Sequence, residues 1–429
     1  MGRTARDHRD MPHPRPVRKI QLSEEHTRRR LIAAVLLLLI GGGALAYSFT
    51  QFISPQGGWQ EIRANTSGGI TCAEEFTFLY DVGSGGASAP VEGRAVISLY
   101  TEACRRAYQA FHTMEGFEGV GNLWDVNHRP NEAVTVDEVL YRAFETVQRG
   151  GERTIYLGPV YERYEDLFYC QDDSQLVDFD PYASGAVREE YAAYAAYAVD
   201  PRAVDVELLG DNRVRLHVSE EYLAFAEEAG ISRFLDFGWL KNAFVTDYLA
   251  QVMIENGYTH GAISSYDGFI RNLDNRGQAY ALNLLDWLDS RPIQAGSMEY
   301  QGPMSLVSLR CFPANEGDGQ RFYQLRDGQV RTMYLDPGDG QCRAAADFMV
   351  CYGDSLGCAE IALKAAPIYI ADGLSEPALQ ELIDGDIRFV CLEERAFLVS
   401  DPRLMLTDLY QSGGVRYSVS YMNERTGGA

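Results

Sequence analysis

The sequence predicts an α+β fold, because segments with the two-residue period of strands and segments with the helical period are mixed without strict βαβ alternation. The chain has 429 residues, of which 46% are apolar and 23% are charged, so it can bury a sizeable core. After an expected linker at 53–70, the sequence contains no second clear linker and no repeat. We therefore expect residues 71–425 to form one folded domain of mixed sheets and packed helices.

Strand and helix patterns are mixed through the first half of this domain. The expected elements are a strand over 76–81 and helices over 98–114, 136–148 and 188–198. Thr135 is expected to cap the second of these helices. Residues 161–180, which are acidic and rich in tyrosine, are expected to form a surface insertion. Tyr191, Tyr194 and Tyr197 recur at helical spacing, which predicts a packed helix face, with a site for an aromatic ligand as the alternative.

The second half begins with a hairpin, since 204–209 and 213–218 alternate in period two around Gly210-Asp211-Asn212. Ser219 can cap the next helix, and Gly230 can close it. Expected strands follow over 234–237, 258–264, 331–335 and 348–352, with a final hairpin of 389–392 and 397–400, and expected helices cover 242–256, 357–366 and 376–383. The strand over 258–264 ends in a polar glycine turn, which is typical of nucleotide or phosphate pockets.

An uncharged run precedes the domain at 31–52 and is long enough to cross about 30 Å of hydrocarbon. Three arginines at 28–30 border its N-terminal end, so the positive-inside rule places the basic tail, residues 1–30, in the cytoplasm. A cleaved signal peptide is the alternative, because Ala44-Leu45-Ala46 resembles a cleavage site with small residues at its first and third positions. We expect an uncleaved transmembrane anchor in the cell membrane, with the domain outside the cytoplasm after a linker at 53–70.

Net charge and cysteine content limit the classes of function. The net charge of −23 argues against a nucleic-acid binder, because phosphate contacts need a basic face. The eight cysteines all lie after the apolar run and contain no C-x-x-C, and Cys342, Cys351 and Cys358 are poorly spaced for zinc. Disulfides and buried free thiols therefore stand as the two main alternatives.

Several stretches match, in order, the motifs of one protein family. They are Trp124-Asp125-Val126-Asn127, Leu157-Gly158-Pro159, Leu235-Asp236-Phe237-Gly238 continuing to Asp247, Ser265-Tyr266-Asp267-Gly268-Phe269-Ile270, Met333-Tyr334-Leu335-Asp336-Pro337-Gly338-Asp339-Gly340 and Ala359-Glu360-Ile361-Ala362-Leu363-Lys364. With the hairpin ahead of the third stretch, the chain resembles the FAD:protein FMN transferase (ApbE) family over roughly residues 70–400 and is identified as a divergent member.

The resemblance implies that the chain uses FAD and a divalent cation, Mg²⁺, and transfers the FMN half of FAD to a threonine hydroxyl of an acceptor protein. It implies catalytic roles for Lys241, Asp336 and Lys364 and a metal-binding role for Glu360. It also implies cofactor contacts from Asn127, Gly238, Asn242, Asp247, Tyr266, Gly268 and Gly340. Such phosphoryl transfer needs a neutralised pyrophosphate charge and a positioned hydroxyl.

The chain departs from the family pattern at positions that carry chemistry. The family lysine falls on Asn242, with Lys241 one residue early, and the family histidine falls on Met333. The metal-binding threonine becomes Lys364, whose ammonium would repel a divalent cation or replace it by pairing with Glu360. These changes favour the alternative function, a catalytically degenerate module of the cell envelope that binds a flavin or another ligand.

Carboxylates also replace neutral family residues at Asp267 and Asp339, where they would repel a phosphate. The remaining candidates have structural interpretations as well. Asp247 and Asp336 can close turns or cap helices, and Glu360 with Lys364 can be a solvated helix pair.

Overall fold

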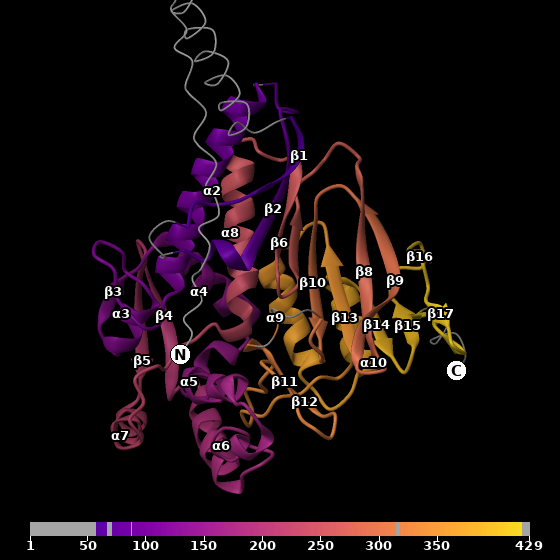
Figure 1. Cartoon of the computed structure of the whole chain (residues 1–429). Helices are drawn as coiled ribbons and strands as arrows, with labels where there is room; N and C mark the ends of the chain where they lie inside the picture. The colour runs from indigo at the N-terminus through magenta and orange to yellow at the C-terminus, as the bar shows by residue number, and fades with distance from the viewer. Residues whose placement is uncertain (1–56, 67–70, 87, 315–317, 319, 423–429) are drawn as a thin grey trace, which may run out of the picture. The chain divides into compact units, whose positions relative to one another are not determined.

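The computed structural model describes residues 57–66, 71–86, 88–314, 318 and 320–422, and its main feature is a nine-stranded sheet (Figure 1). In spatial order the strands are β1 (Gly58–Ile62), β2 (Phe76–Val82), β6 (Gly261–Ser265), β7 (Phe269–Asn272), β10 (Met304–Arg310), β13 (Phe348–Gly353), β14 (Arg388–Glu393), β15 (Ala396–Val399) and β19 (Ser418–Tyr421). All neighbours pair antiparallel except β15 and β19. This sheet confirms the α+β class.

Helices cover one face of the sheet (Figure 1). The covering helices are α2 (Ala89–Phe111), α8 (Lys241–Glu255) and α9 (Cys358–Tyr369), with α4 (Glu138–Gly150) and α10 (Glu376–Asp384) packed on α9. α8 lies between α2 and α9 and contacts both, as well as strands β6 and β7. The start of α8 is therefore held by neighbours on several sides.

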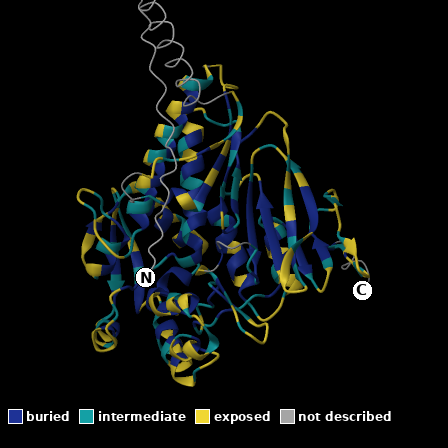
Figure 2. Ribbon diagram, in the orientation of Figure 1, coloured by how far each residue is buried: buried dark blue, intermediate teal, exposed yellow. Residues whose placement is uncertain are grey.

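A smaller three-stranded sheet covers the other face, in the order β16 (Leu406–Thr407), β9 (Arg291–Gln301), β8 (Ala279–Leu288). Period-two alternation separates two cores: Val307 and Leu309 of β10 pack on the helix side, whereas Leu306 packs with Leu284 and Met298 of the small sheet. Both faces of the central sheet are thus covered, and Figure 2 shows its middle strands mostly dark blue.

A further group of elements lies between α2 and α8 in the chain. It comprises α3 (Leu123–His128), β3 (Ala133–Thr135), η2 (Thr154–Tyr156), α5 (Gly158–Tyr164), η3 (Glu165–Tyr169), η4 (Asp173–Asp178), α6 (Gly185–Val199), β4 (Val204–Gly210), β5 (Arg213–Val218) and α7 (Glu220–Ala229). β3, β5 and β4 form their own antiparallel sheet. The chain then enters α8 through the short turn η5 (Gly238–Leu240), so this group ends where the third motif stretch begins.

Many expected elements are confirmed. The expected hairpin is β4 and β5. The Ser219 hydroxyl accepts the Tyr222 N–H at the start of α7, and Gly230 ends that helix with φ +72°. Tyr191 and Tyr194 are buried, so the tyrosine stripe of α6 is a packed face.

Other segments differ from expectation for tertiary reasons. The expected linker at 53–70 contains β1, which pairs with β2, so the folded unit begins before residue 71. Residues 161–180 are not a surface insertion, because Tyr161 and Tyr164 are fully buried. Segment 234–237 is not a strand.

The start of α4 also differs from expectation. Asp137 rather than Thr135 caps this helix, because the Asp137 carboxylate accepts the Val139 N–H at 2.8 Å. Thr135 instead ends β3, where it pairs with Arg213 of β5. The helix therefore begins two residues later than the sequence predicted.

The expected cytoplasmic tail and apolar run, residues 1–52, lie outside the described residues. Within the described residues, no helix has both the length and the apolar content needed to cross a membrane. The membrane anchor therefore stays a prediction.

One carboxylate on α8 joins the helices to the sheet. Asp247 accepts hydrogen bonds from the Cys358 and Ala359 N–H groups at the start of α9, at 2.9 and 2.8 Å. Arg271 of β7 donates to the same carboxylate at 2.8 Å. Burial raises the pKa of Asp247, and Arg271 and the two amides oppose that shift. Because an acid at a helix N-terminus also meets the positive end of the helix dipole, Asp247 acts here as a fold determinant.

We expect Asp247→Asn to lower the free energy of unfolding by about 2–4 kcal/mol, because Arg271 and two helix amides lose their charged partner. Urea denaturation followed by tryptophan fluorescence measures this change. Glu102→Gln breaks an exposed ion pair with Arg105 on α2 and is the control, with an expected change below about 0.5 kcal/mol. Similar small changes in both variants would contradict the anchoring role.

Candidate functional site

A cleft of about 770 Å³ lies beside the start of α8 and collects residues from three motif stretches. Gly238 and Lys241 come from the stretch 235–247, Tyr266 comes from the stretch 265–270, and Met333 comes from the stretch 333–340. Further walls come from the end of α2, from η3 and from the turn η1 (Ala73–Glu75). We call this cavity the motif cleft. Stretches that are far apart in the sequence thus meet around one space.

Gly238 fixes the backbone at the edge of the motif cleft. Its φ of +49° is in the left-handed region. A Cβ at this position would lie 2.5 Å from the Cζ of the buried Tyr161 ring. The Asp236 carboxylate accepts the Gly238 N–H at 2.8 Å and stabilises the turn. Glycine is therefore required at the turn that sets Lys241 at the first position of α8.

Lys241 lines the motif cleft as half of an ion pair. Its Nζ lies 3.1 Å from the Glu75 carboxylate of η1. Burial lowers the pKa of the Lys241 ammonium, but Glu75 outweighs burial and the net shift of this pKa is upward. Lys241 therefore stays a cation, and Glu75 already offsets part of its charge.

Arg321 closes the motif cleft next to Tyr266 and was missed by sequence reasoning. Its guanidinium carbon lies 4.4 Å from the Tyr266 ring centroid, and its Nε and Nη2 donate to the Tyr266 hydroxyl at 3.1 and 2.8 Å. Its Nη1 pairs with Asp267, which also accepts the Asn242 side-chain N–H at 3.2 Å. Asp267 thus binds protein groups, and the buried Asn242 supports it. No motif includes Arg321, so the sequence held no signal for it.

Carboxylates outnumber cations around the motif cleft. The lining carboxylates are Glu75, Glu162, Glu165, Asp166 and Asp236, and the lining cations are Arg233, Lys241 and Arg321. Arg233 lies 3.0 Å from Asp236 and 3.6 Å from Glu165. Burial, followed by the nearby charge of Asp236, raises the pKa of Glu165 to about 7. The cleft therefore contains groups that can bind an anion, but each of its cations already has an acidic partner.

Three predicted cofactor-binding residues hold the backbone and do not line the motif cleft. The buried Asn127 amide bonds the backbone N–H and C=O groups at 234–235, over distances from 2.8 to 3.1 Å. Gly268 has φ +108°, and a Cβ there would lie 2.6 Å from a carbonyl oxygen of β10. Gly340 has φ +72° and packs against α6. Asn127 thereby shapes the segment that leads into Gly238.

Asp336 also lies outside the motif cleft, in the loop after β12 (Val330–Thr332). Its Oδ1 accepts the Gly338 N–H at 2.7 Å, and its Oδ2 pairs with Arg343 at 2.6 Å. Arg343 pairs with Asp339 as well, at 2.7 Å. These contacts close the loop, as the structural interpretation of Asp336 in the sequence analysis predicts. They also direct Asp339 to an arginine and away from any phosphate in the motif cleft.

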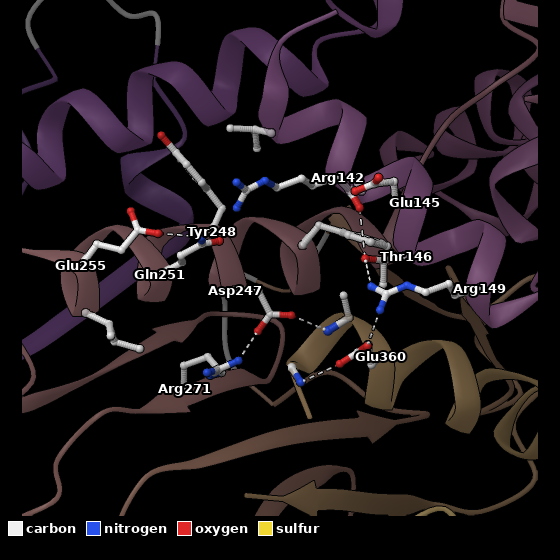
Figure 3. A pocket seen from close by; sticks show the side chains of 16 residues that line it. Arg142, Glu145, Thr146, Arg149, Asp247, Tyr248, Gln251, Glu255, Arg271 and Glu360 are labelled. Carbon is white, nitrogen blue, oxygen red and sulfur yellow. Dashed lines mark hydrogen bonds and ion pairs between the residues drawn. The ribbon is translucent and has the colours of Figure 1, made fainter. Parts of the chain in front are cut away.

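Glu360 and Asp247 line a different cavity, a groove of about 570 Å³ between α4, α8 and α9 (Figure 3). One Glu360 oxygen lies 3.6 Å from Arg149, and the other accepts a backbone N–H at the start of α9 at 3.3 Å. Lys364 is exposed, and its Nζ lies beside Gly385 at the end of α10. In the part of the chain that the structure describes, Glu360 and Lys364 form no ion pair.

The residues do not fit the Mg²⁺ site that the resemblance implies. Arg149 and a backbone N–H already occupy the Glu360 carboxylate, and the Lys364 ammonium lies beside Gly385 at the end of α10. Among the described side chains, no group of three or more His, Cys, Asp or Glu residues is arranged to hold a metal ion. Because Mg²⁺ binds through oxygen ligands in near-octahedral geometry, Glu360 alone is an insufficient protein site.

Neither a protein-family model nor a curated protein sequence matches this chain. Solved structures do match. The chain is similar to the ApbE protein of Thermotoga maritima, with 13% sequence identity and a TM-score of 0.53, over 78% of this chain and 94% of that chain. It is also similar to the flavin transferase ApbE of Vibrio cholerae, with 14% identity and a TM-score of 0.51, over 79% and 94% of the two chains. At these identities the likeness establishes the fold, and the chain is a divergent protein of the ApbE fold.

Proposed function

We propose that this chain is a flavin-transferase-like protein of the cell envelope that binds a flavin nucleotide in the motif cleft and transfers FMN slowly or not at all. The main support is the convergence of Gly238, Lys241, Tyr266 and Met333, from three motif stretches, on one cavity. The fold that the chain shares with the flavin transferase ApbE of Vibrio cholerae supports the same class of ligand.

The motif cleft has the size and the wall chemistry for a flavin nucleotide. Its volume of about 770 Å³ lies within the range of small-molecule sites. Tyr108, Phe111 and Tyr266 line it with aromatic rings that can stack on isoalloxazine or adenine. Lys241 and Arg321 line the same cleft, and the Arg321 guanidinium carbon lies 4.4 Å from the Tyr266 ring centroid, so cations that can pair with a pyrophosphate lie near that ring.

Transfer of FMN needs more than binding. Loss of one preorganised electrostatic partner typically slows a reaction by about 10²–10³-fold. Glu360 and Lys364, where the resemblance implies metal ligands, lie outside the motif cleft. The cations that do line the cleft are already paired with carboxylates. We therefore favour the degenerate form of the function, in which binding is retained and transfer is weak.

A second candidate is a cell-envelope module that binds a ligand other than a flavin. Five carboxylates and three cations line the motif cleft. This surplus of negative charge favours the second candidate, because carboxylates repel phosphates. A neutral or cationic ligand would not meet this repulsion. A folded protein that fails to bind FAD and FMN would support this second candidate.

The proposed location and partner rest on the sequence. The apolar run at 31–52 would anchor the chain in the cell membrane with the domain outside. The proposed partner is an unidentified acceptor protein that presents a threonine. Protease added to intact cells should then digest the domain, and full protection would contradict the orientation.

Transfer is tested by incubating the full-length protein with FAD, Mg²⁺ and a threonine-bearing acceptor domain, and by weighing the acceptor for a gain of one FMN. We expect a rate at least about 10²-fold below that of an active flavin transferase assayed beside it. Lys364→Thr should restore neither transfer nor Mg²⁺ binding, because the Lys364 side chain extends from α9 to the end of α10, outside the motif cleft. Rapid transfer by the wild type would refute the degenerate form.

Lys241→Ala should weaken FAD binding by about tenfold or more, because it removes a cation and leaves the Glu75 carboxylate unpaired in the motif cleft. Titration of flavin fluorescence measures the affinity. Lys364→Ala is the matched control, since it removes an exposed lysine outside the cleft and should leave the affinity unchanged. Equal effects of the two substitutions would place the flavin elsewhere.

FAD affinity should fall as the pH rises through about 7. Burial raises the pKa of Glu165 to about 7, so this carboxyl is neutral below that pH and repels the pyrophosphate above it. His112 also lines the motif cleft, but burial lowers its pKa, so it is uncharged near pH 7. Glu165→Gln should flatten the profile in the same titration. A slope that persists in this variant would show that another group is responsible.

A further inference from the structure

We propose that Cys72 and Cys104 form a disulfide that fastens the wall of the motif cleft built by η1 and α2. The Cys72 thiol donates to the Cys104 carbonyl oxygen at 3.2 Å. Both residues are buried, with exposed fractions of 4% and 0%. Because the Cys72 sulfur already contacts the Cys104 backbone, we infer that rotation of the two thiols brings their sulfurs together.

The two side chains also interact with each other. The nearby Cys104 side chain, together with burial, raises the pKa of the Cys72 thiol well above its usual range. The buried Tyr100, one turn earlier on α2, interacts with both cysteines. The thiols therefore belong to one buried group at the contact between η1 and α2.

The geometry of the other cysteines is less suitable. Cys351 and Cys391 lie on the paired strands β13 and β14 but are diagonal, since Cys351 is opposite Phe389 and Cys391 is opposite Met349. Diagonal residues of an antiparallel pair are about 7–8 Å apart, beyond the usual span of a disulfide. The thiols of Cys170, Cys311 and Cys358 contact oxygens of residues other than cysteine. Cys72 and Cys104 are the pair in which the thiol of one cysteine contacts the other cysteine residue.

The bond can form by thiol–disulfide exchange with a small disulfide such as oxidised glutathione. The Cys72 thiolate attacks the small disulfide, which gives a mixed disulfide and releases one glutathione thiol. The Cys104 thiolate then attacks the Cys72 sulfur and releases the second glutathione thiol. The protein loses two protons and two electrons, and glutathione disulfide is reduced. Cys72 is the entry point because it lines the motif cleft, whereas Cys104 is fully buried.

The disulfide would act on the cleft through two neighbours. Glu75, three residues after Cys72 in η1, is the ion-pair partner of Lys241. Ala107 and Phe111, on the same helix as Cys104, line the motif cleft. The bond would therefore hold the lysine's counter-charge against α2. This inference holds whichever ligand the cleft binds, so failure of flavin binding would leave it intact.

The first test maps the thiols of the purified full-length chain. The reduced protein is equilibrated in buffers of increasing oxidised-to-reduced glutathione ratio, trapped with N-ethylmaleimide, digested and analysed by mass spectrometry. We expect a linked peptide of Cys72 and Cys104 that has lost two hydrogens, with the other cysteines alkylated. The mapping is repeated after refolding from urea in these buffers, because glutathione can then reach thiols that are buried in the folded chain. Alkylation of both Cys72 and Cys104 in oxidised glutathione after refolding would overturn the proposal.

The second test measures the melting temperature with and without reductant. Reduction should lower the Tm of the wild type by roughly 5 °C, because the cross-link restricts the unfolded chain. Cys72→Ala and Cys104→Ala should each abolish this response to reductant. Cys351→Ala is the matched control, since it removes a thiol from the diagonal pair and should keep the response. A response that persists in Cys104→Ala would assign the redox effect to other cysteines and overturn the proposal.

Discussion

The orientation of α8 depends on one carboxylate. Asp247 accepts two N–H groups of α9 and the guanidinium of Arg271 from β7, so a helix, a second helix and a strand meet on a single side chain. Successive residues of an α-helix are rotated by about 100°, so fixing Asp247 also fixes the direction of every other side chain on α8. Lys241 and Val245, four residues apart, line the motif cleft, whereas Tyr248 lines the groove beside Asp247. Asp247 thus positions the residues of the motif cleft without lining that cleft.

Ion pairing explains why the motif cleft is well organised yet weakly suited to phosphoryl transfer. An unpaired charge costs several kcal/mol to remove from water, so a partly buried cation needs an acidic partner. The pairs are Lys241 with Glu75, Arg233 with Asp236, and Arg321 with Asp267. These partners fix the side chains in place, but they also reduce the positive potential that a pyrophosphate would meet. The ion pairs that fix the cleft's side chains for ligand binding therefore weaken the positive potential that would stabilise charge during phosphoryl transfer. The cleft is better suited to binding than to transfer.

Sequence reasoning succeeded where the determinants are local and failed where they are tertiary. The β4–β5 hairpin and the cap at Ser219 were predictable, because turn chemistry and capping depend on residues within a few positions. Strand β1 exists because it pairs with β2, and the segment at 234–235 is held by Asn127 from another helix, which no local pattern reveals. The same limit applies to the site. Motif order located Lys241 in the cleft, whereas Arg321 reaches it from a stretch without a motif.

The matches to the family motifs and the departures from them separate by physical role. The matching residues that hold backbone or loop geometry are Gly238, Gly268, Asp247 and Asp336. The departures include Asn242, Met333, Asp267, Asp339 and Lys364, at positions to which the resemblance assigns contacts with phosphate or metal. A Cβ placed 2.5 or 2.6 Å from a neighbouring atom strains the fold whether or not a ligand binds, so the two glycines are required by packing alone. The positions to which the resemblance assigns catalysis have no such requirement, because side chains with that role would act on a ligand and not on the backbone. A chain can therefore keep the glycines and turn-closing aspartates of this fold after its metal ligands have changed, and agreement at those positions is evidence for the fold but not for the reaction.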